Sequence, residues 1–271
     1  MKYHHYVALE GVRASDLKAL RKSPLHCHER EDGDSGRALR AMHALLLEPE
    51  VFDEDFVVFE GKARRGKAYE AFAAEHEGYT ILNQREEEAA RSVVEGVLRH
   101  PVARRLLNER GESEVTLTWT DPDTGLPCKG RLDRLAGGSL IIDAKGYGTS
   151  DPREISRRVA RLGAHVQLAH YRRGLELARG VRDARVMIIS YETRPPYDVA
   201  VVELESDALA IGERERAKLM AQYAECLESG KWPGRCPEVV PLILPDWLSA
   251  ELGDDEDGDY EEYVYPEEDW P

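Results

Sequence analysis

The chain has 271 residues, 42% of them hydrophobic, and a formal net charge of -15 at pH 7. That length is sufficient for a domain with a sizeable core, and no apolar run reaches the roughly 18 residues that a membrane-spanning helix needs. The N-terminus lacks the apolar segment of a secretory signal. We therefore expect a soluble, cytoplasmic protein that does not act on a membrane.

The negative charge is concentrated at the C-terminus. Residues 249–271 contain eleven acidic residues and neither Lys nor Arg, which leaves a net charge of -4 on the rest of the chain. A nucleic-acid partner needs a positive surface, and the nearly neutral remainder can provide one. We expect residues 1–248 to form a single domain. Residues 249–271 are predicted to be a disordered acidic tail that serves solubility or imitates the charge of DNA.

The four cysteines are Cys27, Cys128, Cys226 and Cys236. They lie far apart and form no Cys-x-x-Cys pair, which is the spacing that zinc ribbons and many disulfide-stabilised domains show. Closely spaced ligands of an iron–sulfur cluster are also missing. We therefore expect reduced thiols and no iron–sulfur cluster.

The part of the chain up to about residue 110 is predicted to be mainly helical. Ser15-Asp16 begins a short helix that stops at Ser23-Pro24, and Pro101 interrupts a much longer one. The predicted helices lie at about 15–23, 37–47, 62–77 and 84–107.

The segment from about 111 to 205 is richer in β-branched and apolar residues. Residues 114–120 alternate, and turns at 121–125 and at Gly137-Gly138 lead into two further strands, 128–135 and 139–145. These three strands are predicted to form an antiparallel meander. A long helix at about 152–179, strands at 186–191 and 199–204, and a helix at about 206–229 follow. We expect an α/β fold with a central sheet flanked by helices, and an extension up to residue 248.

Two acidic residues and a lysine lie close together in the predicted meander. Asp133 is in one strand, and Asp143 follows at the end of the next. Lys145 comes two residues later, on the same face as Asp143, because side chains in a strand alternate with period two. Paired carboxylates can hold divalent metal ions, and a nearby cation can position or deprotonate a water that attacks a phosphodiester. The three residues therefore predict a metal-dependent hydrolytic site.

Several motifs in order resemble those of the PD-(D/E)XK nuclease superfamily. Gly130-Arg-Leu-Asp133, Ile141-Ile-Asp-Ala-Lys145 and Gln167-Leu-Ala-His-Tyr171 correspond to its core signature. The flanking segments point to the catalytic domain of RecE (exonuclease VIII) and its phage relatives, and more distantly to lambda-type exonuclease. Those segments are Ser15-Asp-Leu-Lys18, His43-Ala-Leu-Leu-Leu-Glu-Pro49, Trp119-Thr-Asp-Pro-Asp-Thr-Gly125, Pro195-Pro-Tyr197 and Leu244-Pro-Asp-Trp247.

The resemblance implies a restriction-endonuclease-like core with a mixed sheet, and it assigns roles to individual residues. Asp133, Asp143, Lys145, Gln167 and Tyr171 would be catalytic. The metal ligands would be His43, Asp133, Asp143 and the carbonyl of Ala144. A terminal 5′ phosphate of DNA would be bound by Ser15, Arg131 and Gln167. Glu114 is a further carboxylate that could belong to the site.

The resemblance also implies an activity and partners. It points to a Mg²⁺-dependent deoxyribonuclease, active with Mn²⁺ as well, that degrades one strand of linear double-stranded DNA from 5′ to 3′. The remaining 3′ single strand would pass to a RecT-like annealing protein for recombination. Such bacterial and phage-encoded enzymes form rings of three or four subunits around DNA ends.

Each of these residues also has a simpler interpretation. An Asp two positions before a Lys occurs by chance at exposed strand ends, and a histidine such as His43 on an apolar helix is often only a core residue. Gln167 and Tyr171, one helical turn apart, could form an interhelical contact. Glu114 could be a solvated strand end.

Two other functions therefore stay open. The first is a PD-(D/E)XK nuclease of other polarity or of endonucleolytic mode. The second is a catalytically weak DNA-binding or scaffold relative.

The chain departs from its relatives at three positions. Gly146 replaces the usual Thr after the lysine, Leu132 replaces a Pro, and Leu39 replaces a Gly four residues before the histidine. None of these changes removes a predicted metal ligand or the lysine, so we expect activity to be retained.

Overall fold

The computed structural model describes residues 3–30, 36–61, 63–236 and 238–243. Met1–Arg235 form one compact unit and Cys236–Pro271 a second one. Every helix and strand described below belongs to the first unit. The predicted acidic tail lies outside the described residues, and the domain boundary at residue 248 stays a prediction.

The N-terminal part is mainly helical, as predicted. Its helices are α1 Tyr3–Ala8, α2 Ala14–Leu20, α3 Pro24–His28, α4 Arg37–Leu47, α5 Pro49–Asp55, α6 Lys67–Glu75, α7 Gln84–Arg99 and α8 Pro101–Asn108. Ser23 lies between α2 and α3. It caps α3, because its hydroxyl accepts a hydrogen bond from the amide of His26 at 3.3 Å. Pro101 separates α7 from α8, since proline is tolerated only in the first turn of a helix.

Several features of this part differ from the prediction. Helices α1, α3 and α5 were not among the predicted helices. A small parallel sheet, β1 Phe56–Phe59 paired with β2 Thr80–Asn83, was not predicted. The helix expected at 62–77 is shorter, because Gly66 has a φ of 86° and α6 begins only after it.

The central sheet has five strands in the order β3-β4-β5-β6-β7. The strands are β3 Gly111–Thr120, β4 Pro127–Ala136, β5 Leu140–Lys145, β6 Arg185–Tyr191 and β7 Val199–Glu203. All neighbours are antiparallel except β5 and β6, which are parallel. The sheet is therefore mixed, and its first three strands form the predicted meander.

The helix predicted at 152–179 is two helices. α9 Pro152–Leu162 ends at Gly163, and α10 Ala164–Arg179 begins there. Gly163 has a φ of 71°, a left-handed conformation that ends helices and favours glycine. A Cβ at this position would also lie 2.8 Å from Nη1 of Arg21. The left-handed backbone of Gly163 therefore breaks the helix, and the close approach of Arg21 also favours a residue without a side chain here.

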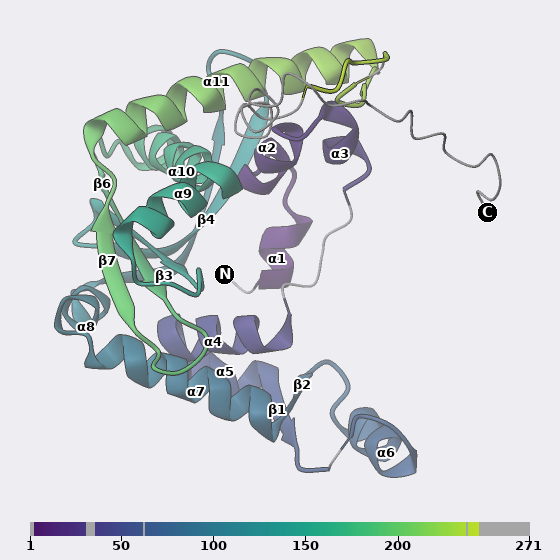
Figure 1. Cartoon of the computed structure of the whole chain (residues 1–271), viewed down its shortest axis with the longest axis vertical. Helices are drawn as coiled ribbons and strands as arrows, with labels where there is room; N and C mark the ends of the chain where they lie inside the picture. Colours follow the sequence, from purple (N-terminus) through teal and green to yellow (C-terminus); the bar gives the residue numbers. More distant parts are fainter. Residues whose placement is uncertain (1–2, 31–35, 62, 237, 244–271) are drawn as a thin grey trace, which may run out of the picture. The chain divides into compact units, whose positions relative to one another are not determined.

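Helices cover both faces of the sheet, as predicted (Figure 1). One hydrophobic core joins the sheet to α2, α9, α10 and the last helix, α11 Ser206–Ser229. The other joins it to α4, α5, α7 and α8. Burial of these two apolar layers supplies most of the driving force for folding. In the described part of the chain, no helix combines the length and apolar character needed to cross a membrane.

Candidate metal centre

The sheet opens around Asp133. On one side, β3 and β4 pair at Ser113–Arg134 and at Val115–Leu132, but the pairing skips Glu114 and Asp133 between them. Glu114 has a φ of 51°, which is rare for residues other than glycine and turns its backbone out of the ladder. Glu114 thus lies inside β3 and does not open it.

On the other side, pairing of β4 with β5 ends at Arg134–Ile142. Beyond that pair, the Asp133 carboxylate accepts a hydrogen bond from the amide of Ala144 at 2.8 Å. A side chain therefore replaces the next rung of the ladder. The strands diverge here while β5 remains paired with β6 as far as Lys145, and this divergence makes room for a site.

Three ligand-type side chains meet at the opening, and we call His43, Glu114 and Asp133 the carboxylate–histidine set. One nitrogen or oxygen atom from each lies within 4.8 Å of the others. Helix α4 contributes His43, whose Nε2 lies 3.7 Å from Oδ2 of Asp133 and whose Nδ1 lies 3.8 Å from Oε1 of Glu114. The carbonyl oxygen of Ala144 lies 3.2 Å from His43 Nε2. The predicted ligands His43, Asp133 and Ala144 are thus brought together, with Glu114 among them.

The electrostatics of this set favour positive charge. Burial lowers the pKa of His43, but the carboxylates of Asp133 and Glu114 outweigh burial and raise it to about 9. Arg131 forms an ion pair with Glu114 and lies 3.7 Å from Oε2 of Glu48. The two carboxylates at this opening, Glu114 and Asp133, therefore attract two cationic side chains, those of His43 and Arg131.

A second group of side chains lies beside this set, and we call Lys18, Asp143, Lys145 and Gln167 the lysine–glutamine network. Nζ of Lys145 lies 2.8 Å from Oδ2 of Asp143, as expected for side chains on one face of a strand. Only 1% of the Asp143 side chain is exposed. Burial raises the pKa of its carboxyl, whereas the Lys145 ammonium opposes the shift.

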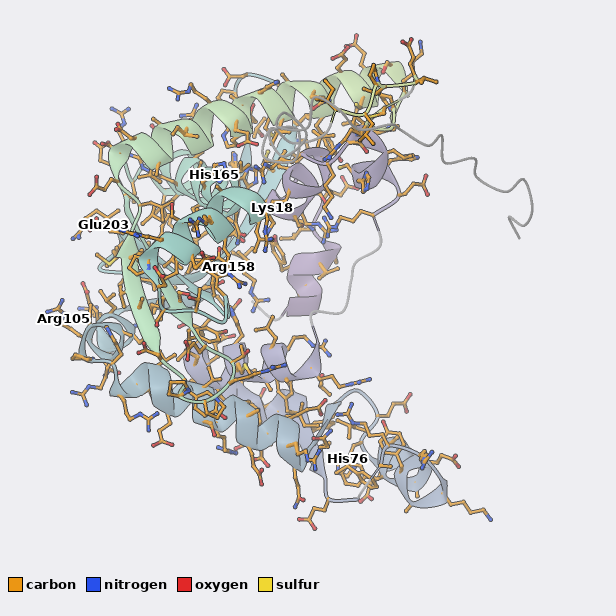
Figure 2. The ribbon with its side chains drawn as sticks, in the orientation of Figure 1. Lys18, His76, Arg105, Arg158, His165 and Glu203 are labelled. Atoms are coloured by element: carbon orange, nitrogen blue, oxygen red, sulfur yellow. The ribbon has the colours of Figure 1, made fainter. Side chains whose placement is uncertain are left out.

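Helix α10 brings Gln167 and Tyr171 to the same place. The Gln167 side-chain amide donates to Oδ1 of Asp143 at 3.4 Å and to the Tyr171 hydroxyl at 3.2 Å. Its carbonyl oxygen accepts a hydrogen bond of 3.0 Å from Nζ of Lys18. Lys18, labelled in Figure 2, is carried by α2, which packs against α10. Burial and then the charge of Lys145 lower the pKa of Lys18 to about 8.

The predicted site residues thus fall into separate groups. Asp143 lies outside the carboxylate–histidine set, because its oxygens face Lys145 and Gln167. Ser15 accepts a hydrogen bond of 2.8 Å from Arg30, whereas Arg131 contacts Glu114 and Glu48. The three residues predicted to bind a 5′ phosphate therefore have different partners, and their roles stay predictions.

Lys18 was not among the predicted site residues, although its segment was. A lysine on an amphipathic helix usually extends into solvent, so the sequence held no signal except its place in the Ser15-Asp-Leu-Lys18 motif.

The replacement of threonine by Gly146 has a packing explanation. A Cβ at Gly146 would lie 3.1 Å from the Tyr191 ring, 3.3 Å from Cγ2 of Thr193 and 3.5 Å from Cδ1 of Leu39. Leu39 is itself one of the departures, so two of the three unusual positions are neighbours in space. A side chain at 146 would therefore crowd Tyr191 and Thr193 and would touch Leu39 at ordinary contact distance.

The carboxylate–histidine set fits a divalent cation. Carboxylate and carbonyl oxygens suit Mg²⁺ and Mn²⁺, and an imidazole suits transition metals. Two carboxylates also supply the negative charge that a doubly charged ion requires. The donor set by itself does not select one of these ions.

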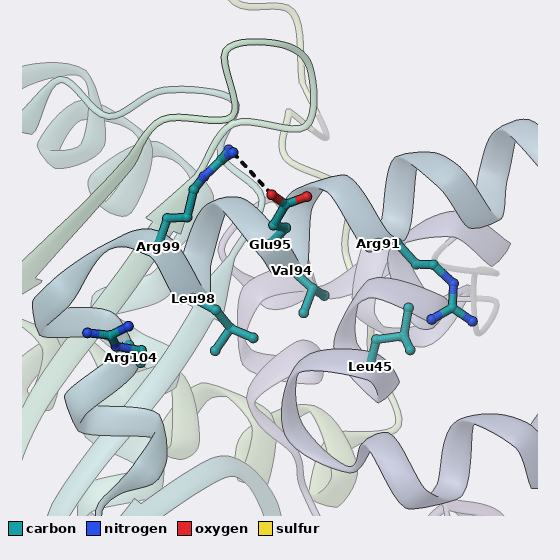
Figure 3. A pocket seen from close by; sticks show the side chains of 7 residues that line it. All are labelled: Leu45, Arg91, Val94, Glu95, Leu98, Arg99 and Arg104. Atoms are coloured by element: carbon teal, nitrogen blue, oxygen red, sulfur yellow. Dashed lines mark hydrogen bonds and ion pairs between the residues drawn. The ribbon is translucent and has the colours of Figure 1, made fainter.

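A surface groove is lined by residues of α4, α7 and α8 (Figure 3). Its volume is about 380 Å³, and Leu45, Val94 and Leu98 line it together with three arginines. In the close-up, Arg99 is paired with Glu95. None of the predicted site residues lines this groove, so it is not the proposed reaction site.

Comparison with known proteins identifies the family of the chain. A family model described as a PDDEXK-like domain of unknown function (DUF3799) matches residues 14–241. No curated protein sequence matches the chain. A putative exonuclease from Eubacterium rectale has a similar structure, with a TM-score of 0.61 and 12% identity over 93% of this chain and 98% of that one. A phage-related exonuclease from Haemophilus somnus 129PT also matches, with a TM-score of 0.36 and 17% identity over 83% of this chain and 97% of that one. The chain belongs to the PDDEXK-like family.

Proposed function

We propose that the protein is a metal-dependent deoxyribonuclease. The observation that carries this proposal is the meeting of the carboxylate–histidine set with the Asp143–Lys145 pair where β4 and β5 diverge. A phosphodiester in that opening would contact a cation-binding group on one side and an ammonium on the other. Membership in the PDDEXK-like family supports the same activity.

The side chains divide the work of hydrolysis. His43, Glu114, Asp133 and the Ala144 carbonyl would hold the cation. A bound divalent cation would polarise the phosphoryl oxygen and lower the pKa of a bound water. Lys145, fixed by Asp143, would donate a hydrogen bond that orients the attacking water or stabilises developing negative charge. Gln167 and Tyr171 would keep Asp143 in place.

The finer proposal is a 5′-to-3′ exonuclease that uses Mg²⁺, with Mn²⁺ as a substitute. Its support is the resemblance of the motifs to the RecE branch, together with a fold shared with a putative exonuclease. The substrate would be the end of linear double-stranded DNA, and the product a 3′ single strand for a RecT-like annealing protein. A ring of three or four subunits would hold the DNA. We extend the proposal to a role in recombination on these grounds.

Digestion of end-labelled linear duplex beside closed circular DNA tests the proposal. With Mg²⁺ we expect mononucleotides from linear DNA with a 5′ phosphate, intact circles, and no digestion in EDTA. Cutting of circles would favour an endonuclease, and release from the 3′ end would favour the opposite polarity. DNA binding without cleavage under any divalent cation would favour the scaffold alternative.

A further inference from the structure

Lys18 is a partly buried lysine whose ammonium contacts a neutral amide instead of a carboxylate. Among the described residues it forms no ion pair with a carboxylate within 4.0 Å, and its one hydrogen bond goes to the neutral amide of Gln167. An ammonium has three donors, so two remain. Burying a charge without a paired counter-charge costs free energy, and an anionic ligand beside the ammonium would offset that cost.

The surroundings of Lys18 increase the need for an anion. Asp143 is the nearest carboxylate of the network, and Lys145 already forms an ion pair with it at 2.8 Å. Two lysines therefore share one carboxylate. The network has a formal charge of +1, while the neighbouring carboxylate–histidine set contains two carboxylates and would hold a cation. Gln167 connects Lys18 to Asp143, because its amide donates to Asp143 while its oxygen accepts from Lys18.

We propose that Lys18 binds a phosphate group of the DNA strand that enters the opening, with Gln167 holding its ammonium toward that phosphate. This inference rests on the proposed nuclease function. The ammonium would be a point charge for a nonbridging phosphate oxygen, as is usual for lysines that bind phosphate. Lys18 would then be a substrate-binding residue that determines affinity more than the chemical step.

A simpler alternative is a purely structural contact between α2 and α10. In that case the lysine would matter for folding and not for DNA. Lys22 offers a matched control, because it follows the same helix and its side chain is exposed.

The test compares Lys18→Met with Lys18→Arg and with the control Lys22→Met. Binding of a fluorescent linear duplex is measured in EDTA across a salt series, cleavage is measured in Mg²⁺, and thermal unfolding reports on the fold. Lys18→Met should weaken binding and raise KM by roughly 10- to 100-fold, as expected for the loss of one charge-assisted hydrogen bond. The slope of log affinity against log salt should fall by about 1.

Lys18→Arg should recover most of the binding, and Lys22→Met should change neither KM nor the salt slope. An unchanged salt slope and KM in Lys18→Met, with only a lower Tm, would overturn the inference and leave a structural contact. If Lys18→Met does not fold, Lys18→Gln replaces it and must show the same loss of affinity. Failure of the parent protein to cleave any DNA would refute the proposed nuclease, and this result is separate because binding is measured without metal.

Discussion

The two halves of the site are built from adjacent strands but have opposite charge. The carboxylate–histidine set has two carboxylates around one imidazole, at a place where both neighbouring ladders are interrupted. The lysine–glutamine network has two lysines and one carboxylate, on a strand that keeps its pairing with β6 to the end. The carboxylate–histidine set is therefore the acidic half of the site and suits a cation. The lysine–glutamine network is the basic half and suits a phosphate. The sheet supplies the carboxylates and Lys145, whereas helices α4, α2 and α10 supply His43, Lys18 and Gln167.

The largest effect should come from removing one charge of the carboxylate–histidine set. Asp133→Asn keeps an oxygen that can accept the amide of Ala144, so the fold should survive. The rate of cleavage in Mg²⁺ should fall roughly 1000-fold, because metal catalysis contributes several kcal/mol. Initial rates on end-labelled duplex check this, with Tm as the control. A folded variant that cuts as fast as the parent would contradict the assignment.

Acidic pH should lower the stability of the fold around α10, the helix that carries Gln167 and Tyr171. His170 precedes Tyr171 on α10 and is fully buried, and burial with the charge of Arg216 lowers the pKa of its imidazole to about 4. The unfolded chain binds this proton near pH 6.5. Protonation of His170 therefore leaves the free energy of unfolding unchanged above pH 6.5. As the pH falls toward 4, the free energy of unfolding decreases by up to about 3 kcal/mol, because the unfolded chain binds the proton more readily.

Urea unfolding at several pH values measures this effect. His170→Gln removes the titrating group, so its stability should fall less steeply than that of the parent between pH 6.5 and 4. Parallel curves for the two proteins would show that His170 does not titrate in this range.

Two substitutions at Glu114 separate its charge from its backbone. Glu114→Gln and Glu114→Gly should both raise the Mn²⁺ concentration for half-maximal cleavage by roughly 10- to 100-fold. A positive φ costs a residue other than glycine about 1 kcal/mol. Only Glu114→Gly removes this cost at position 114, where φ is 51°. Its free energy of unfolding should equal or exceed that of Glu114→Gln. A clearly less stable glycine variant would mean that this backbone is not strained.

The smallest effect should come from restoring the residue usual in relatives. Gly146→Thr places atoms against the Tyr191 ring and Thr193, so we expect a loss of about 1–2 kcal/mol of stability. Leu39→Ala in the same chain should recover part of that loss, because Leu39 lines the same space. Urea unfolding of the two single variants and the double variant measures the coupling. Strict additivity would show that the two departures are independent.

Much of the basic half was predictable because strands follow local rules. Alternation and a Gly-Gly turn predicted the meander, and the period of two placed Asp143 and Lys145 on one face.

β1 and β2 were missed because each has four residues and pairs across more than twenty residues of sequence. Gly163 is a single glycine inside a helical pattern, so only its left-handed backbone reveals the break.

The acidic half was less predictable because it depends on interrupted pairing. Glu114 was expected at a strand end, but it lies inside β3, and its positive φ cannot be read from a glutamate in an alternating pattern. In the basic half, Lys18 was missed for a similar reason, because its place depends on the packing of α2 against α10, two helices far apart in sequence. Contacts of this kind come from tertiary structure and not from local propensity.

The most direct test of the division into two halves is a calorimetric titration of Mn²⁺ into the DNA-free protein. The parent, Asp133→Asn and Lys18→Met are titrated side by side. If the acidic half holds the cation, Asp133→Asn should lose binding while Lys18→Met retains it with an affinity close to that of the parent. Binding that survives in Asp133→Asn, or that disappears in a folded Lys18→Met, would contradict the account.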